Sequence, residues 1–425
     1  MRSRDLTDPL KRRPFRRLLT TYTVNELGDW MGIIALSVLV FEQTDSALAT
    51  AVLFLGTRFL PSLAAPILVT RGERPPPRFA LPVIYAGEAT AFGALALLAD
   101  HFSLIAVVVV ATIDGALALT GRSLTRATVV ALLEPAGELR AGNALLNVAF
   151  TAGAALGPGF AGLIVAGFGV PAALLLDAVS FYVIAWLLLT AGPLPQAEPE
   201  PGKMRERVRA GIAYLREQKT LRRLLTAQGI AFIFFAAVIP IEVIYAKETL
   251  GTSDSGYGLL LASWGVGMVA GSLVFAAVRR APLPLLLFFS TVAVGAGYLG
   301  IAVAPTLAVA CIVSIVGGAG NGVQWVSMVS ATQELTASEM QARVMSVLES
   351  TGAAMPGIGI ALGGVIAALV SPRAAFLVAG LGVLATVAVA AIALGRNWPQ
   401  HREKEAGEAV DADLEIMVEL IPAGR

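Results

Sequence analysis

The sequence predicts an all-α membrane protein with twelve transmembrane helices arranged in two six-helix halves. Three observations predict it: an apolar composition, twelve long apolar runs and an internal repeat. Apolar types make up 56% of the 425 residues, only 14% are charged, and mean hydropathy is +0.75. Soluble globular chains are about 45–50% apolar and about 25% charged. The net charge of +1 gives no indication of a nucleic-acid partner, and the expected surroundings are a lipid bilayer.

The apolar runs have the length of membrane crossings. A bilayer core about 30 Å thick needs about 20 helical residues, because each residue rises about 1.5 Å. Each run must be helical, because backbone polar groups in hydrocarbon have to be satisfied within the segment. Breaking the chain at charges and at Gly or Pro clusters gives twelve such runs: 17–41, 48–70, 79–99, 103–121, 139–168, 171–191, 223–246, 256–278, 282–303, 306–330, 342–369 and 374–395.

The repeat divides these runs into equal sets. The pentapeptide RRLLT occurs at 16–20 and again at 222–226, and the stretch 159–175 can be laid over 361–377 at nearly the same offset. Each repeated stretch falls on the equivalent helix in the first six and in the second six runs. We therefore expect a duplicated architecture with a substrate site between the halves near the midplane.

The predicted organisation has four parts. The N-terminal half covers 1–191 and the C-terminal half covers 223–396. They are joined by a cytoplasmic linker, 192–222, and followed by an acidic cytoplasmic tail, 397–425. The linker contains a helical pattern with apolar residues on one face and charges on the other, which is typical of a helix on a membrane surface or of a solvated connector. The apolar face consists of Met204, Val208, Ile212 and Leu215.

Positive charge predicts the orientation. Of the 31 Lys and Arg residues, 28 lie in segments that fall on one side of the twelve runs. Lys247 and Arg373 fall on the other side, and Arg58 lies inside the second run. Because positive loops stay in the cytoplasm, we expect both termini in the cytoplasm and the protein in the cell inner (cytoplasmic) membrane.

The sequence lacks the motifs of several functional classes. Cys311 is the only cysteine, and the two histidines are His101 and His401, so no disulfide framework or helix-borne zinc site is expected. The sequence contains no P-loop, no H-E-x-x-H and no D-D-x-x-D run. We expect no enzyme activity, no cofactor and no metal, although a membrane-embedded enzyme stays as the least favoured alternative.

Five stretches of the sequence carry a family resemblance: NELGDW (25–30), RFLP (58–61), LRAGNALLNVAFTAGAALGPGFAG (139–162), YAKETLGTSDSGYGLLLASWGVGMVAGSL (245–273) and GAGNGVQWVSMVSATQELTASEMQARVMSV (318–347). They resemble the major facilitator superfamily, and the resemblance covers about residues 15–395. They are most similar to the branch that includes macrolide-efflux proteins and enterobactin exporters. That resemblance implies that helices one, four, seven and ten line the cavity, that inward-open and outward-open states alternate, and that transport is often coupled to protons.

The loop between helices two and three departs from the family pattern. The superfamily signature resembles G-x-x-x-D-R followed by basic residues, and its Asp steadies one conformation. Here Pro66 stands in place of the Gly and Thr70 in place of the Asp, while Arg71 remains. The resemblance gives Arg71 a gating role, but the missing acid leaves proton coupling an open question.

Helix five carries a pattern of small residues. Gly153 and Gly157 are four apart, Pro158 removes a backbone donor, and Gly162 ends the pattern. Small residues at this spacing allow two membrane helices to approach closely. The stretch resembles the antiporter signature G-x-x-x-G-P-x-x-G-G, with Ala161 at the first of the two final glycines. It favours export, although Gly-rich packing also occurs in helices of proteins that are not antiporters.

Charged residues inside the spans indicate a polar cluster. Glu26, Asp29 and Trp30 share one face of helix one, and Asp114 in helix four and Arg58 in helix two reach a comparable depth. A charge in the membrane needs a partner or water. We expect Arg58 to be the charge partner of Asp29 or Asp114, which leaves at least one carboxylate free to carry a proton. In the alternative, Asp29 only ties helix one to Arg58 and never titrates.

Other polar and aromatic residues are candidates for the cavity and the gate. Asn321 and Gln324 on helix ten can hydrogen-bond either a substrate or neighbouring helices. Trp30 and Trp325 can contribute an aromatic wall, Glu242 lies where water can reach it, and Glu349 can hold the cytoplasmic gate.

Taken together, these patterns predict a secondary exporter of amphipathic small molecules, of drug or siderophore type, that works by alternating access and proton antiport. Its partners are a small-molecule substrate, protons and the bilayer, and we expect a monomer. The alternative from the same fold is a lysolipid or lipid translocase.

Overall fold

The computed structural model describes residues 8–64, 75–190, 194–196, 204–278, 281–337 and 340–394. Within these ranges the chain is helical and contains no strand. The N-terminal half consists of η1 (Asp8–Lys11), α2 (Arg13–Thr44), α3 (Ala47–Phe54), η2 (Leu55–Phe59), α5 (Pro77–Asp100), α6 (Leu104–Leu133), η3 (Glu134–Ala136) and α7 (Leu139–Leu189).

The C-terminal half is preceded by α8 (Met204–Glu217). The first span of this half is interrupted near one end, where α9 is followed by Pro240 and by short helical turns. The elements are α9 (Lys219–Ala236), η4 (Ile239–Ile241), α10 (Glu242–Ile244), η5 (Tyr245–Thr249), α11 (Asp254–Ala277), α12 (Leu283–Val303), α13 (Leu307–Glu334), α14 (Gln341–Leu369) and α15 (Pro372–Leu394).

The helices supply twelve membrane crossings. Eleven helical stretches of the described chain are long and apolar enough to span a bilayer. One of them, Ala141–Leu189, has 49 residues, more than twice the length that a bilayer core of about 30 Å requires. It bends at Gly169, where a φ of 82° breaks the helical conformation, so it contributes two crossings. The predicted all-α multi-pass fold is confirmed.

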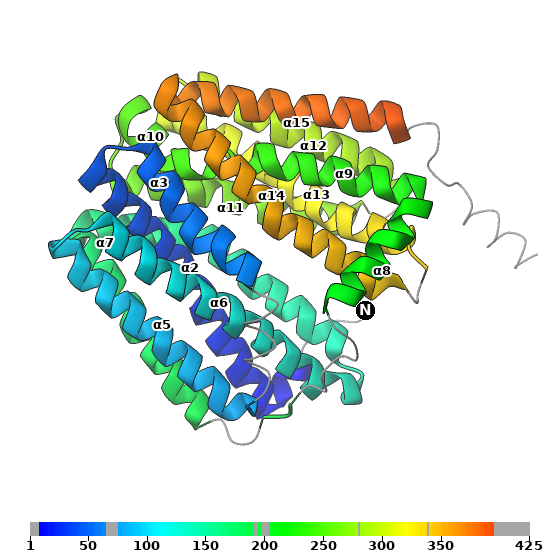
Figure 1. The fold of residues 1–425 in the computed structure, drawn as a ribbon, viewed down its shortest axis with the longest axis horizontal. Helices are drawn as coiled ribbons and strands as arrows, with labels where there is room; N and C mark the ends of the chain where they lie inside the picture. Colours follow the sequence, from blue (N-terminus) through cyan, green and yellow to red (C-terminus); the bar gives the residue numbers. More distant parts are fainter. Residues whose placement is uncertain are drawn as a thin grey trace, which may run out of the picture.

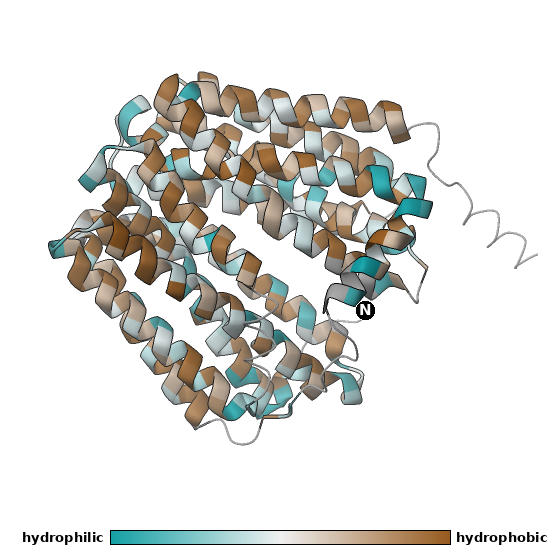
Figure 2. Cartoon of the chain, in the orientation of Figure 1, coloured by the Kyte–Doolittle hydropathy of each residue, from teal (hydrophilic) through white to brown (hydrophobic). Residues whose placement is uncertain are grey.

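The two halves form separate bundles. Figure 1 shows the blue-to-cyan helices of the N-terminal half together, and the green-to-orange helices of the C-terminal half beside them. Hydrophobic residues run along the helices and hydrophilic residues gather toward their ends and on α8 (Figure 2). Large apolar side chains such as Ile105, Leu369 and Ile392 are exposed, as expected for surfaces that face lipid.

Polar residues begin three of the helices at the end opposite α8. The side chains of Ser46, Ser103 and Thr306 each accept a hydrogen bond from the third backbone amide that follows. Such caps satisfy amide groups that a helix start would otherwise leave unpaired. Each of these turns is therefore a short, well-defined reversal between two spans.

The fourth span is longer than the sequence predicts. We placed its end at residue 121, because Arg122 follows, but α6 continues to Leu133. The physical reason is that Arg122 and Arg126 have polar partners on α2, so their charges do not end the helix. Counting both arginines as loop residues was therefore wrong.

The linker helix packs against the C-terminal half. Leu215 of α8 is buried in a cluster that includes Leu224 of α9 and Met328 of α13, whereas Ile212 is exposed. The Tyr214 hydroxyl also accepts a hydrogen bond from the backbone amide of Ala337, at 3.3 Å. The apolar stripe thus serves in part as a docking face for the second half.

Candidate functional site

A polar cluster lies inside the N-terminal half, centred on α2. Its acidic residue Asp29 is half-buried and faces α6, where Arg122 Nη2 approaches Asp29 Oδ2 to 3.7 Å. One turn earlier on α2, Asn25 Nδ2 donates a hydrogen bond to the same oxygen, at 3.0 Å. Asp29 therefore has a cation and an amide donor as partners.

A second arginine of α6 reaches the same helix. Arg126 Nη2 donates to the hydroxyl of Tyr22, at 3.2 Å, one turn before Glu26 on α2. Arg122 and Arg126 are four apart and so lie on one face of α6. This face of α6 therefore meets the acidic face of α2 over several turns.

Arg58 does not make the predicted ion pair. Among the described residues it has no salt bridge to Asp29 or Asp114, and its guanidinium lies 5.8 Å from the ring centroid of Trp30. Arg58 sits in the π-helical turn η2, which adds a residue to the helix and turns its side chain toward α2. Coulombic attraction still links Arg58 with Asp29 and Glu26. The predicted partner is thus a neighbour of the cluster, and the contact with Asp29 comes from Arg122.

Several carboxylates of this half lack partners. In the described structure, oxygens of Glu26, Asp114, Glu88 and Asp177 are enclosed without a hydrogen bond. Asp114 is 8% exposed and Glu26 is 1% exposed. Charged groups in such surroundings are costly unless they are paired or take up a proton. The cluster therefore holds carboxylate oxygens that no arginine contacts.

Glu88 and Asp177 lie outside the central face. A carboxylate oxygen of Asp177 is 2.8 Å from the place that a Cβ on Gly28 would occupy, so Asp177 packs against the backbone of α2. Glu88 lies between α5 and α6, close to Gly121. Both positions are interhelical contacts rather than surfaces of a chamber.

Small residues of α7 allow this helix to pack closely on α2 of its own half and on α11 of the other half. A Cβ at Gly153 would meet Glu26, and one at Gly157 would lie 2.6 Å from Trp30 Cβ, so both glycines allow α7 to lie directly on the acidic face of α2. Farther along, Gly162 lies against Gly258 of α11, and the carbonyl of Pro158 faces the same glycine. These contacts join the polar cluster to the packing between the halves.

A second cross-half contact mirrors the first. Gly364 of α14 lies against Ala51 of α3, as Gly162 of α7 lies against Gly258 of α11. In the repeat, residue 162 corresponds to residue 364. Each half therefore presents an equivalent glycine to the other half.

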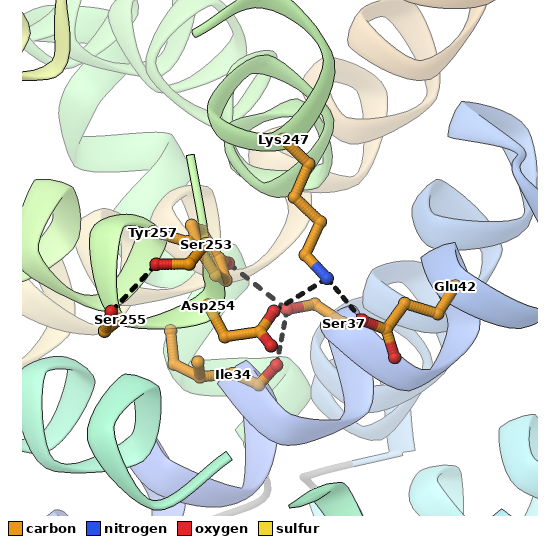
Figure 3. A network of polar contacts seen from close by, with 8 residues as sticks. All are labelled: Ile34, Ser37, Glu42, Lys247, Ser253, Asp254, Ser255 and Tyr257. Carbon is orange, nitrogen blue, oxygen red and sulfur yellow. Dashed lines mark hydrogen bonds and ion pairs between the residues drawn. The ribbon is translucent and has the colours of Figure 1, made fainter. Parts of the chain in front are cut away.

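Ion pairs close the end of the molecule opposite α8 (Figure 3). Lys247 Nζ lies 2.5 Å from Glu42 Oε1 of α2 and 2.7 Å from Asp254 Oδ1 of α11. Deeper in the same contact, the hydroxyls of Ser37 and Tyr257 are 3.2 Å apart and buried. The Lys247–Glu42 pair and the Ser37–Tyr257 contact connect the N-terminal half to the C-terminal half, whereas the Lys247–Asp254 pair lies within the C-terminal half. Lys247 lies in the second π-helical turn, η5.

Several polar contacts near α8 lie within one half. Arg12 binds Glu138 at 2.7 Å and Arg17 binds the carbonyl of Thr190, all in the N-terminal half. Hydrogen bonding to Arg12 lowers the pKa of Glu138. Arg223 donates to the carbonyl of Ala393 in the C-terminal half. One hydrogen bond does cross between the halves, because the Ser62 hydroxyl donates to the carbonyl of Ala353 on α14, at 3.3 Å.

A small pocket opens in the C-terminal half between α9, α12, α13 and α15. Its volume is about 40 Å³. Asn321, Gln324 and Trp325 line it, together with Gln228, whose Oε1 accepts a hydrogen bond from Gln324 Nε2 at 2.8 Å. The rings of Phe232 and Trp325 lie 6.3 Å apart. Three cavity residues named from the sequence thus lie together.

The other predicted residues are dispersed or undescribed. Glu242 is half-buried at the start of α10, away from the pocket lining. Arg71 lies outside the described residues, as does the side chain of Glu349 on α14.

A family model for transmembrane secretion effectors matches residues 6–409. The chain belongs to the transmembrane secretion effector family. No curated protein matches it in sequence. This family member is accordingly a membrane transporter of the major facilitator type.

Solved structures show the same fold for this transmembrane secretion effector. A point mutant of the nucleoside transporter NupG is similar with a TM-score of 0.73 and 13% identity, covering 89% of this chain and 99% of that one. A POT family transporter in complex with a thioalcohol-conjugated peptide has a TM-score of 0.71 and 12% identity, covering 89% and 96%. A bacterial homologue of the iron transporter ferroportin, in an inward-facing state, has a TM-score of 0.68 and 15% identity, covering 90% and 98%.

Three residues of these sites were not predicted from the sequence: Arg122, Gln228 and Lys247. Arg122 follows Asp114 by eight residues, which places both on one face of α6, and that spacing was the available signal. Gln228 precedes Phe232 by one turn in the same way. Lys247 carried a weaker signal: Asp254 follows it by seven residues, but Glu42 comes from α2, which only the fold brings near.

Proposed function

We propose that this transporter is a secondary active exporter of amphipathic small molecules, of the drug or siderophore type. It works by alternating access and exchanges substrate for protons. In this proposal it lies in the cytoplasmic membrane as a monomer, with both termini in the cytoplasm. The resemblance of its motifs to macrolide-efflux and enterobactin exporters supports the substrate class.

The observation that carries the proposal is an enclosed acid of α6, Asp114, that has no ion pair among the described residues. Asp29 has Arg122 as a partner, whereas Asp114 has an enclosed oxygen without one. Asp114 is also within electrostatic range of Asp29, which repels its charge, and of Arg122, which attracts it without forming an ion pair. A proton on either carboxylate relieves the repulsion between Asp29 and Asp114. Because the two acids interact, this proton belongs to the pair rather than to one residue. We assign Asp114 as the member that is neutralised by the proton.

A cationic substrate competes with that proton. Asp29 is more accessible than Asp114 and lies next to Trp30, whose ring can pack on an apolar or cationic group. When a cation neutralises Asp29, the repulsion that favours a proton on Asp114 falls, and the proton leaves. The proton and the cationic substrate therefore exclude each other. This couples proton movement to substrate movement, because the acidic cluster never carries both positive charges across the membrane at once.

Alternating access is supported by the ion pair at the end opposite α8. Lys247 joins the halves at the end opposite α8, whereas Arg12 and Arg223 near α8 bind within their own halves. An end at which an ion pair joins the halves fits a state that is closed there and is loaded from the side of α8. With α8 in the cytoplasm, this is the state that loads substrate for export.

Transport by the purified chain in proteoliposomes tests the proposal. Vesicles are loaded with ethidium, tetraphenylphosphonium, erythromycin or lysophosphatidylcholine, and efflux is followed with and without an imposed pH gradient. Proton antiport predicts uphill movement of the cations only while the gradient lasts. Movement of the lysolipid alone would replace the proposal with a lipid translocase, and efflux that ignores the gradient would remove the antiport step.

A further inference from the structure

The pocket in the C-terminal half is a polar site without charge. Seven of its lining residues can contact a ligand through an amide, a hydroxyl or an aromatic ring, and all of its lining residues are uncharged. These seven are Gln228, Phe232, Phe235, Thr291, Asn321, Gln324 and Trp325. A group that enters it gains hydrogen bonds and ring contacts but meets no counter-charge.

The two glutamines define what the pocket can bind. Gln324 Nε2 donates to Gln228 Oε1 at 2.8 Å, and this bond uses one hydrogen of one amide and one lone-pair direction of the other. The Gln228 amide nitrogen and the Gln324 carbonyl oxygen have no protein partner in the described chain, and neither is completely enclosed. Whichever way the two amides are turned, the pair presents one N–H donor and one C=O acceptor to the pocket.

A pocket that offers one donor and one acceptor is complementary to a secondary amide, whose C=O and N–H point to opposite sides of the group. The ligand carbonyl accepts from the free N–H, while the ligand N–H donates to the free carbonyl, so both polar groups of the pocket are satisfied together. An ester of the same shape has no N–H and leaves the glutamine carbonyl unpaired, which carries a free-energy cost.

The size and walls of the pocket fit the same group. The volume of about 40 Å³ exceeds the about 10–15 Å³ that one water requires, so it admits a few heavy atoms and no large scaffold. Phe232 and Trp325 stand 6.3 Å apart beside it and offer ring faces to a planar group.

We propose that this pocket is a subsite for a neutral secondary amide or lactam carried by the substrate. The assignment rests on the proposed export function and narrows its substrate class. The preferred substrate then has two parts: a cationic or apolar part held near Asp29 and Trp30 in the N-terminal half, and an amide-bearing part held by Gln228 and Gln324 in the C-terminal half. An amphipathic molecule of this kind contacts both halves at once.

Equilibrium binding of a matched probe pair tests the assignment. Procainamide and procaine are both cationic and aromatic, and they differ in an amide N–H against an ester oxygen. Binding to the full-length protein in nanodiscs is measured by equilibrium dialysis, with tetraphenylphosphonium as a cation that forms no hydrogen bond. We expect procainamide to bind about tenfold more tightly than procaine, the effect of about one well-made hydrogen bond.

The control is a variant that removes the amide pair without leaving one partner behind. Gln228→Leu/Gln324→Leu replaces both groups with apolar side chains of similar size, a change that is often nearly neutral for stability. The tenfold preference should vanish in this variant, and thermal unfolding checks that the variant is folded. Equal binding of the two probes to the wild type, or a preference that survives the double substitution, would overturn the subsite. Failure of the wild type to bind tetraphenylphosphonium would instead count against the proposed export of cations.

Discussion

Arg122 Nη2 of α6 lies 3.7 Å from Asp29 Oδ2 of α2, inside the apolar part of the N-terminal half. This contact explains why α6 runs through residue 122 without ending. It also gives Asp29 a cation, so that Asp114 is left as an acid without one. The proposed exchange of proton for substrate depends on that difference.

The Arg122–Asp29 pair should behave as a coupled unit in stability. Arg122→Gln alone leaves Asp29 without its cation and should cost about 1–3 kcal/mol. Adding Asp29→Asn removes the unpaired charge, so the double variant should recover part of the loss. Thermal unfolding of the purified variants measures this. Strictly additive losses would show that the two residues do not interact.

Lys247 should hold the end opposite α8 closed. Lys247→Met removes its bonds to Glu42 and Asp254, and a loss of about 1 kcal/mol raises the open population about fivefold. The readout is labelling of Ser37→Cys by a membrane-impermeant thiol reagent, in a chain with Cys311→Ser. We expect faster labelling from the outside.

A second ion pair provides the matched control. Lys11 binds Asp8 at 2.6 Å within the N-terminal half, so Lys11→Met removes a lysine without separating the halves. It should leave the labelling rate unchanged. If both lysine variants label alike, the Lys247 contacts are not a closure.

Close packing of α7 on α11 should be needed for transport. Gly162→Val places a side chain against the backbone of Gly258, whose Cα would lie 2.9 Å from the new Cβ. Overpacking of this kind costs about 1–3 kcal/mol and should disfavour the state in which the helices touch. Gly167 on the same helix has nothing within 4 Å of an added Cβ, so Gly167→Val should transport normally. Equal rates in the two variants would contradict the role of this contact.

Glu88 should be dispensable for coupling although it is buried. It lies between α5 and α6 with both oxygens unpaired, and it is within electrostatic range of Asp29 and Arg122 but makes no ion pair among the described residues. Glu88→Gln keeps the shape and removes any charge, so we expect unchanged transport and equal or higher thermal stability. A pH-independent transport rate in Glu88→Gln would mean that the proton resides there.

Much of the fold could be predicted because its signals are local. Length and hydropathy predict the spans, and Gly169 with Pro171 separates two helices that are otherwise one continuous stretch. The end of the fourth span could not be predicted from local charge. Whether Arg122 ends a helix depends on Asp29, and that contact exists only once α2 and α6 are packed.

The acidic residues of the candidate site could be predicted from the sequence, but the residues that contact them could not. An acidic residue in a span is conspicuous, so Asp29 and Asp114 stand out. Arg58 was matched with Asp29 by depth alone, whereas the π-helical turn at η2 carries it over Trp30. The Gln228–Gln324 pair likewise joins two helices that are far apart in the chain, and no spacing rule links them.

Proton release on substrate binding tests the central claim most directly. Tetraphenylphosphonium is added to the purified protein in weakly buffered solution, and a pH indicator reports the protons set free. Competition within the acidic cluster predicts about one proton per bound cation in the wild type. Asp114→Asn should release none while still binding, and Asp29→Asn should bind weakly. Binding by the wild type without proton release, or unchanged release from Asp114→Asn, would contradict the account.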